Sequence, residues 1–206
     1  MKENTAKILE SLMNGRPELA AMRTALVEAY ETLLATFRSG GKVLVCGNGG
    51  SAADCEHICG ELLKRFQRPR PVPPAIAAKL RPELAARLEG ALPAVSLVSM
   101  SGILSAFAND VAWETAFAQQ VLGLGESRDT LIALSTSGNS ANCVAAVEVM
   151  AAKGGATIAF TGAGESRLSA VADVTLRAPA VETYRVQEYH LPIYHALCAM
   201  IEEELF

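Results

Sequence analysis

The sequence predicts an α/β fold with a five-stranded parallel sheet flanked by helices on both faces. Five short apolar runs alternate along the chain with segments of helical periodicity. Runs this apolar are typical of parallel strands that are buried on both faces, and most of them lead into a Gly- or Ser-rich turn. The expected strands are 42–46, 94–98, 130–134, 156–160 and 174–177.

Two N-terminal helices precede the first expected strand. Apolar residues recur at helical spacing from residue 3 to 38, with an interruption at residues 14–17, Asn-Gly-Arg-Pro. Further helices are expected at 52–66, after Ser101-Gly102, at 141–153 and at 185–205. All 206 residues fit a single domain, because α/β units often run to about 200–250 residues around one sheet.

One segment interrupts this alternation. Residues 68–74, Arg-Pro-Arg-Pro-Val-Pro-Pro, cannot form a helix interior because proline lacks the amide proton. Leu84, Leu88 and Leu92 then recur at a spacing of four, which predicts a short amphipathic helix over 81–92. We therefore expect an insertion at about residues 69–92, which forms a surface excursion or oligomer contact, or else a lid over the site.

Composition argues against several functional classes. Eighteen basic and 22 acidic residues give a net charge of −4, which offers no basic surface to nucleic acid. No apolar run is long enough to cross a membrane and no signal peptide is recognisable, so we expect a cytoplasmic protein. The five cysteines form no CxxC pair and are expected to be reduced and structural. Only 19% of residues are charged, which suggests that other subunits cover part of the surface.

The strongest candidate binding loop is residues 135–140, Ser-Thr-Ser-Gly-Asn-Ser. It follows an expected strand and precedes a helix, whose N-terminus attracts anions through its free amide groups and its dipole. Four hydroxyls exceed what a helix cap needs, so the loop predicts a phosphate site, with a serine-rich cap as the alternative.

A second loop, the glycine loop of residues 47–51 (Gly-Asn-Gly-Gly-Ser), follows the first strand. It is not the GxGxxG fingerprint, and the chain has no GxxxxGK[ST] motif, so no nucleotide cofactor is expected. Its glycines permit close approach of the backbone to a ligand, or merely turn the chain. In the following helix, His57 and Glu61 are four residues apart and share a face, as a base and its neighbour or two metal ligands would.

The last expected helix carries Gln187, Glu188, His190 and His195. All three histidines of the chain therefore lie in two segments and beside carboxylates, which makes a functional role as credible as a core or surface position. Arg65, one turn beyond Glu61, is expected to pair with that carboxylate, to reach substrate oxygens, or to remain a solvated surface charge.

Taken together, these motifs resemble the sugar isomerase (SIS) family, and specifically the phosphoheptose isomerases. The resemblance begins at about residue 20 and rests on the order and spacing of five motifs. They are the glycine loop, His57 with Glu61, Asn109-Asp110, the 135–140 loop, and Arg185-Val186-Gln187-Glu188 with His195. It implies a flavodoxin-like three-layer SIS sandwich, a homotetramer with active sites between subunits, and interconversion of sedoheptulose 7-phosphate with D-glycero-D-manno-heptose 7-phosphate in heptose biosynthesis.

The resemblance also implies roles for individual residues. Glu61 would be the general base and His195 the general acid of an enediol mechanism. The residues that bind the phosphate would be Ser135, Thr136, Ser137 and Ser140. The residues that line the substrate would be Asn48, Gly49, Gly50, Ser51, Arg65, Asn109, Asp110 and Gln187. Some members of the family look like zinc proteins, whose ligands would be His57, Glu61, Gln187 and His195.

This chemistry suits the residue types, because moving a proton between C1 and C2 needs a base at carbon and an acid or metal at oxygen. Tyr184 and Gly60 depart from the family pattern, which often has an acidic residue at each position. Two other functions stay open: a non-enzymatic SIS module that binds a sugar phosphate or a protein partner, and an isomerase of another phosphosugar. Retention of both Glu61 and His195 favours the enzyme over the binding module.

Overall fold

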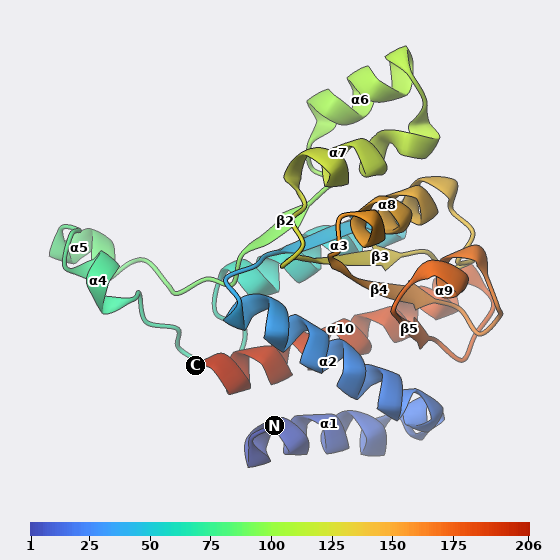
Figure 1. Cartoon of the computed structure of the whole chain (residues 1–206). Coiled ribbons are helices and arrows are strands. Elements are labelled where there is room, and N and C mark those ends of the chain that lie inside the picture. Colours follow the sequence, from blue (N-terminus) through green and yellow to red (C-terminus); the bar gives the residue numbers. More distant parts are fainter.

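The computed structural model describes residues 1–206 and is built around a parallel sheet of five strands in the order β2-β1-β3-β4-β5 (Figure 1). The strands are β1 (Val43–Gly47), β2 (Ala94–Ser96), β3 (Thr130–Leu134), β4 (Ala156–Thr161) and β5 (Val174–Arg177). All five expected strands are confirmed, with ends that differ by two residues or fewer. In the register of the sheet, Leu44 lies beside Leu131 and Ile132 beside Ile158.

Helices cover both faces of the sheet, which makes the three-layer sandwich that the sequence predicts. On one face lie α2 (Arg23–Arg38), α3 (Gly50–Leu63) and α10 (Thr183–Leu205), with α1 (Glu3–Gly15) packed on α10 and a 3-10 helix (Pro17–Met22) between α1 and α2. On the other face lie α7 (Ala116–Leu124), α8 (Ala141–Ala152) and α9 (Arg167–Val171), while α6 (Ser101–Asp110) and a 3-10 helix (Trp113–Thr115) pack outside them.

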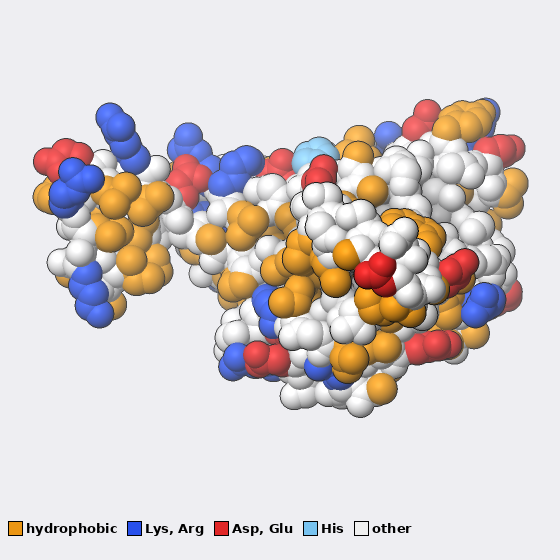
Figure 2. Space-filling model, turned by 90° about the horizontal axis from the view of Figure 1, so that it is seen from above, with side chains coloured by type: hydrophobic (Ala, Val, Ile, Leu, Met, Phe, Trp, Pro, Cys, Tyr) orange, Lys and Arg blue, Asp and Glu red, His pale blue; other side chains and the backbone are white.

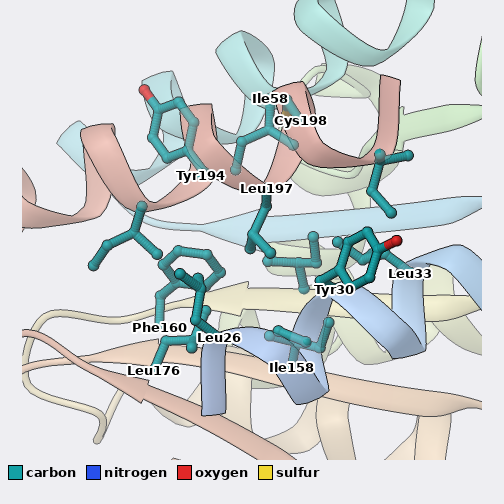
Figure 3. Close-up of a cluster of buried hydrophobic side chains, with 14 of the residues drawn as sticks. Leu26, Tyr30, Leu33, Ile58, Ile158, Phe160, Leu176, Tyr194, Leu197 and Cys198 are labelled. Carbon is teal, nitrogen blue, oxygen red and sulfur yellow. The ribbon is translucent and has the colours of Figure 1, made fainter. Parts of the chain in front are cut away.

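Alternate residues of each strand enter one core or the other, as the two-residue period of a strand requires. Ile132 and Phe160 pack with Leu26, Leu197 and other apolar side chains of the helices on the first face. Figure 3 shows Phe160 with Leu26 and Leu197 in this core. Their neighbours in the strands, such as Leu131, point to the opposite core. A sheet buried on both faces in this way gives strands that are apolar throughout, which is why they could be recognised in the sequence.

Helices α3 and α10 run parallel on the same face and both begin at the carboxyl edge of the sheet. Near their first turns, the Gln187 side chain lies so close to Gly50 that a Cβ there would be 2.5 Å from its amide nitrogen. Near their last turns, Glu202 accepts hydrogen bonds from the backbone at Phe66. The glycine loop and the 135–140 loop lie at the same edge, where ligands bind in open α/β sheets.

Residues 69–92 form an arm that projects from the body of the molecule (Figures 1 and 2). It contains only two short helices, α4 (Pro74–Ala77) and α5 (Pro82–Ala85). The expectation of an amphipathic helix over 81–92 is therefore wrong beyond its first turn. Leu84 and Leu88 remain exposed, and a helix that short is not stable without a core to pack against.

A buried ion pair anchors the base of the arm. Arg70 donates from Nε to Glu202 at 2.6 Å, and both side chains are fully buried. The Glu202 carboxylate also accepts the backbone N–H groups of residues 66–68. The Arg70 guanidinium donates hydrogen bonds to the carbonyl oxygens of Glu61 and Leu62, which have no partner within the helix because they lie in the last turn of α3.

The remaining expectations concern cysteines and membrane segments. All five cysteines are free and buried, as expected of structural thiols. None of the helices combines the length and the apolarity that a membrane span needs.

Candidate active site

The 135–140 loop connects β3 to α8 and exposes polar groups at the start of that helix. The hydroxyls of Ser135 and Ser140 contact each other at 2.9 Å, so the Ser140 side chain does not cap α8. Gly138 adopts a φ of +65°, which turns the chain sharply, and its N–H donates to the Ser135 carbonyl. The Ser137 side chain is exposed. A helix N-terminus without a side-chain cap, beside the exposed Ser137 hydroxyl, is suited to an anion such as phosphate.

An amide pair joins the two loops of the carboxyl edge. Asn48 of the glycine loop and Asn142 of α8 exchange two hydrogen bonds of 2.9 Å. Gly49, next to Asn48, has a φ of +57° that favours glycine. Asn142 is absent from the candidates that the sequence supplies, because nothing in its local sequence distinguishes it from other helix residues.

The second part of the site is a cluster of His57, Glu61 and His195 where α3 faces α10. The Nε2 atom of His57 lies 3.2 Å from Glu61 Oε1 and 3.4 Å from His195 Nε2. The other carboxylate oxygen of Glu61 accepts from Lys64 at 3.0 Å. The His57 side chain is 42% exposed and that of Glu61 only 12%. The structure thus brings three of the predicted residues together at one point that remains open to solvent.

Asp54 and Tyr194 support this cluster from behind, and neither was predicted from the sequence. The Tyr194 hydroxyl lies 3.1 Å from Asp54 Oδ1 and 2.9 Å from His57 Nδ1. The Tyr194 ring joins the core, while its hydroxyl points away from Leu197 and Phe160 (Figure 3). Burial raises the pKa of Tyr194 above its usual range, so the hydroxyl keeps its proton. Asp54 lies three residues before His57 on the same helix face, which is the one signal that could have identified it.

His195 also borders a hollow of about 400 Å³ between α1, α10 and Phe66. Burial lowers the pKa of His195, His57 lowers it further, and Glu61 opposes both effects. The imidazole is therefore mainly neutral near pH 7, when one ring nitrogen can donate a proton and the other can accept one.

The other predicted site residues occupy different places. Gln187 is half-buried against Gly50, about 12 Å along the helix axis from His195, and Ser51 is buried at the start of α3. The Arg65 side chain pairs with Glu89 of the arm at 3.0 Å, whereas Lys64 takes the place beside Glu61. Thr136 is half-buried in its loop. Asn109 and Asp110 bond to each other at the exposed end of α6, which the structure does not bring to the histidine cluster.

Tyr184 and Gly60, the two positions that depart from the family pattern, make few contacts with the rest of the chain. Tyr184 is exposed and its ring stacks under the Arg185 guanidinium at 5.7 Å. Gly60 lies on α3 with no atom within 4 Å of the place that a Cβ would take. The structure therefore leaves room for a side chain at residue 60.

The donor atoms of the histidine cluster fit zinc, which binds imidazole nitrogen and carboxylate oxygen. Separations of 3.2 and 3.4 Å match the edge of a ligand tetrahedron, roughly 3.3–3.4 Å for zinc–ligand bonds of about 2.0–2.1 Å. Gln187, the fourth ligand implied by the resemblance, lies elsewhere. In the single chain, no group of three or more His, Cys, Asp and Glu side chains is arranged so that it could hold a metal ion.

A larger hollow of about 600 Å³ lies at the opposite, amino edge of the sheet. Its two carboxylates already have partners, since Asp129 pairs with Lys42 and Asp173 accepts from Thr157. Without a free reactive group, this hollow does not compete with the carboxyl edge as a candidate active site.

Family models, related sequences and solved structures all place this chain in the same family. SIS-domain family models match residues 16–92 and 102–201. A phosphoheptose isomerase from Roseiflexus is 40% identical over 88% of this chain and 82% of its own, and one from Alkalilimnicola ehrlichii is 38% identical over 96% and 92%. The solved structure of the Neisseria gonorrhoeae phosphoheptose isomerase superposes with a TM-score of 0.76 at 31% identity and 98% coverage of both chains. The chain therefore belongs to the phosphoheptose isomerase family of SIS-domain proteins and is an isomerase.

Proposed function

We propose that this chain interconverts sedoheptulose 7-phosphate and D-glycero-D-manno-heptose 7-phosphate. The observation that carries the proposal is the meeting of Glu61, His57 and His195 on two parallel helices that both begin at the carboxyl edge of the sheet. Membership of the phosphoheptose isomerase family supports the choice of substrate. The reaction moves a proton between adjacent carbons, which a carboxylate and an imidazole can perform together.

Glu61 acts as the base in this proposal. Its carboxylate takes the proton from the carbon next to the carbonyl, while the N–H of His195 gives a proton to the carbonyl oxygen, which yields an enediol. Return of the proton from Glu61 to the neighbouring carbon, with loss of the other hydroxyl proton to His195, completes the isomerisation. A neutral imidazole can act as this donor, which agrees with the lowered pKa of His195.

The 135–140 loop binds the phosphate at the far end of the open-chain sugar. His57 lies two turns into α3, about 10 Å along the helix axis from the first turn at the carboxyl edge. A substrate phosphate held by Ser137 and the start of α8 would orient the reacting carbons toward Glu61. Binding energy at the phosphate would then contribute to catalysis at the other end of the molecule.

We also propose a zinc ion held by His57, Glu61 and His195, without Gln187, which lies elsewhere on α10. Such an ion would supply Lewis-acid polarisation of the sugar oxygens. Elemental analysis of protein purified without chelator should find about one zinc per subunit, and the His57→Ala variant should lose it. Protein that is fully active and metal-free would contradict this proposal.

We also propose that the chain assembles into a homotetramer. No residue of α6 is buried, and Ile103, Val111 and Trp113 are 38%, 65% and 45% exposed in the single chain. Apolar groups this exposed are typical of a surface covered by another subunit. Light scattering should give about four times the chain mass of 21.7 kDa, and a monomer would contradict the proposal.

The activity is tested by Glu61→Gln. The amide keeps the shape of the side chain but cannot accept the C–H proton, so turnover should fall by about 10²–10⁴-fold. Glu56→Gln is the matched control, because Glu56 lies on the same helix and only bonds to Ser99. Wild-type turnover in Glu61→Gln would refute the assignment of the base. A wild type that binds phosphosugars and converts none of them would favour the non-enzymatic SIS module.

A further inference from the structure

One contact in the candidate site connects the core to the reactive cluster through a single hydroxyl. Tyr194 is only 2% exposed, yet its hydroxyl reaches both the Asp54 carboxylate and the Nδ1 atom of His57. The ring of Tyr194 also packs edge-on against the His57 ring, with centroids 5.5 Å apart. The hydroxyl therefore belongs to a rigid side chain whose position is set by the core.

The direction of these hydrogen bonds follows from the groups involved. A carboxylate only accepts, so the single hydroxyl proton of Tyr194 must point to Asp54. The hydroxyl oxygen is then left with lone pairs toward His57, and Nδ1 of His57 must carry a proton and donate it. The Nε2 atom is left as the ring nitrogen that faces Glu61 and His195.

We infer that Tyr194 is a positioning residue: held by Asp54, it fixes the ring orientation of His57 and its Nδ1–H tautomer, which leaves Nε2 free to act in the active site. The inference rests on the proposed function, because it assigns His57 a part in that site. A hydrogen-bonding partner of this kind orients a histidine ligand and sets its tautomer.

Packing alone does not account for the arrangement. The His57 ring touches Tyr194 and His195 edge-on, and these contacts restrict its position. They are the same for either tautomer, because ring edges do not distinguish Nδ1–H from Nε2–H. Two groups do make that distinction. The Tyr194 hydroxyl favours a proton on Nδ1, whereas the Glu61 carboxylate, 3.2 Å from Nε2, favours a proton on Nε2 when no metal is bound. Removal of the hydroxyl should therefore shift the tautomer toward Nε2–H while the packing stays.

The test is Tyr194→Phe, which deletes the hydroxyl and keeps the ring. Tyr189→Phe is the matched control, because Tyr189 lies on the same helix and packs at the edge of the same core without contacting His57. Two-bond proton–nitrogen NMR spectra of the metal-free proteins should be recorded at about pH 8, above the ordinary histidine pKa of about 6.5. The chain has three histidines, so each ring can be assigned by single substitutions.

The wild type and Tyr189→Phe should show His57 protonated at Nδ1, and Tyr194→Phe should shift it toward the Nε2–H form that an unconstrained imidazole prefers. Zinc affinity, measured by competition with a chromophoric chelator, should fall by about 10–100-fold in Tyr194→Phe alone. An Nε2–H tautomer in the wild type, or the same tautomer and affinity in all three proteins, would overturn the inference.

These measurements do not require turnover. A wild type without isomerase activity but with the expected tautomers would refute the proposed substrate and leave the positioning role intact. An active enzyme in which Tyr194→Phe changes neither the tautomer nor zinc affinity would refute the positioning role and leave the proposed substrate intact. Circular dichroism melting of both variants establishes that each remains folded.

Discussion

Acid should destabilise this fold through His190, the one histidine that the proposed mechanism does not use. His190 lies fully buried on α10, with Nε2 3.3 Å from the Thr161 carbonyl oxygen and the ring edge-on to Phe160. Its Nδ1 atom is buried without a partner. Burial lowers the pKa of His190 from 6.5 to about 4, and the hydrogen bond to Thr161 opposes this only in part.

The sign and size of the effect follow from linkage. Between about pH 6.5 and pH 4 the unfolded chain binds a proton at residue 190 and the folded chain does not, so stability falls as the pH is lowered. At about 1.4 kcal/mol per pH unit, the difference between 6.5 and about 4 corresponds to about 3 kcal/mol of unfolding free energy, lost in full only below pH 4. The contribution is fully present above pH 6.5.

The assay compares the wild type with His190→Gln, whose amide can still donate to Thr161 but does not titrate. Urea unfolding at a fixed protein concentration should be measured at several pH values from about 7 to 4. Carboxyl groups such as Asp54 titrate in both proteins, so their effect cancels in the difference. The stability advantage of the wild type should shrink by up to about 3 kcal/mol on acidification. A difference that does not change with pH would refute the reasoning, as would a directly measured His190 pKa near 6.5.

Two further pairs of substitutions test the loops and the arm. Gly138→Ala should destabilise the protein by at least about 1–2 kcal/mol and weaken sugar-phosphate binding, because residue 138 has a φ of +65° and its Cβ would meet the Ser166 hydroxyl; calorimetry and urea unfolding measure both, and Gly60→Ala, with open space around it, should be neutral or stabilising. Leu84→Glu in the exposed arm should change the unfolding free energy by less than about 0.5 kcal/mol, whereas Leu197→Ala in the core should cost about 2–5 kcal/mol. Equal effects within either pair would contradict the structure.

Strands and loops were predictable because their signals are local. Residues 131–134 are apolar and are followed directly by the serine-rich loop, and β3 covers the expected residues 130–134. The helix expected over 81–92 failed for the opposite reason. Its leucine spacing is helical, but periodicity says nothing about whether a core exists to receive Leu84 and Leu88, and in the arm none does.

The cluster of His57 with Glu61 was half predictable, since a spacing of four residues puts both on one face. Its partners on α10 were a different problem. Tyr194 meets Asp54 only because α3 and α10 pack side by side, and 140 residues of chain separate the two. The resemblance supplied His195 but not Tyr194, whose role depends on a hydroxyl direction that only the packed structure defines.

The ion pair of Arg70 and Glu202 shows the same dependence on packing, and it connects the arm to the proposed base. Glu202→Ala removes the partner of a fully buried guanidinium and should cost about 3–5 kcal/mol. Glu203→Ala is the matched control. Its partner Arg68 is 44% exposed and can turn to water when Glu203 is removed, so that substitution should cost less than Glu202→Ala.

Stability is not the only quantity that Glu202→Ala should change. The Arg70 guanidinium donates a hydrogen bond of 2.9 Å to the backbone carbonyl oxygen of Glu61. If Arg70 loses its partner and moves toward water, Glu61 loses this hydrogen bond. We expect turnover to fall at temperatures where the variant is still folded, whereas Glu203→Ala should keep wild-type turnover. If Glu202→Ala unfolds at lower urea but keeps full turnover while folded, the pair serves stability alone, and the position of Glu61 is set by α3 itself.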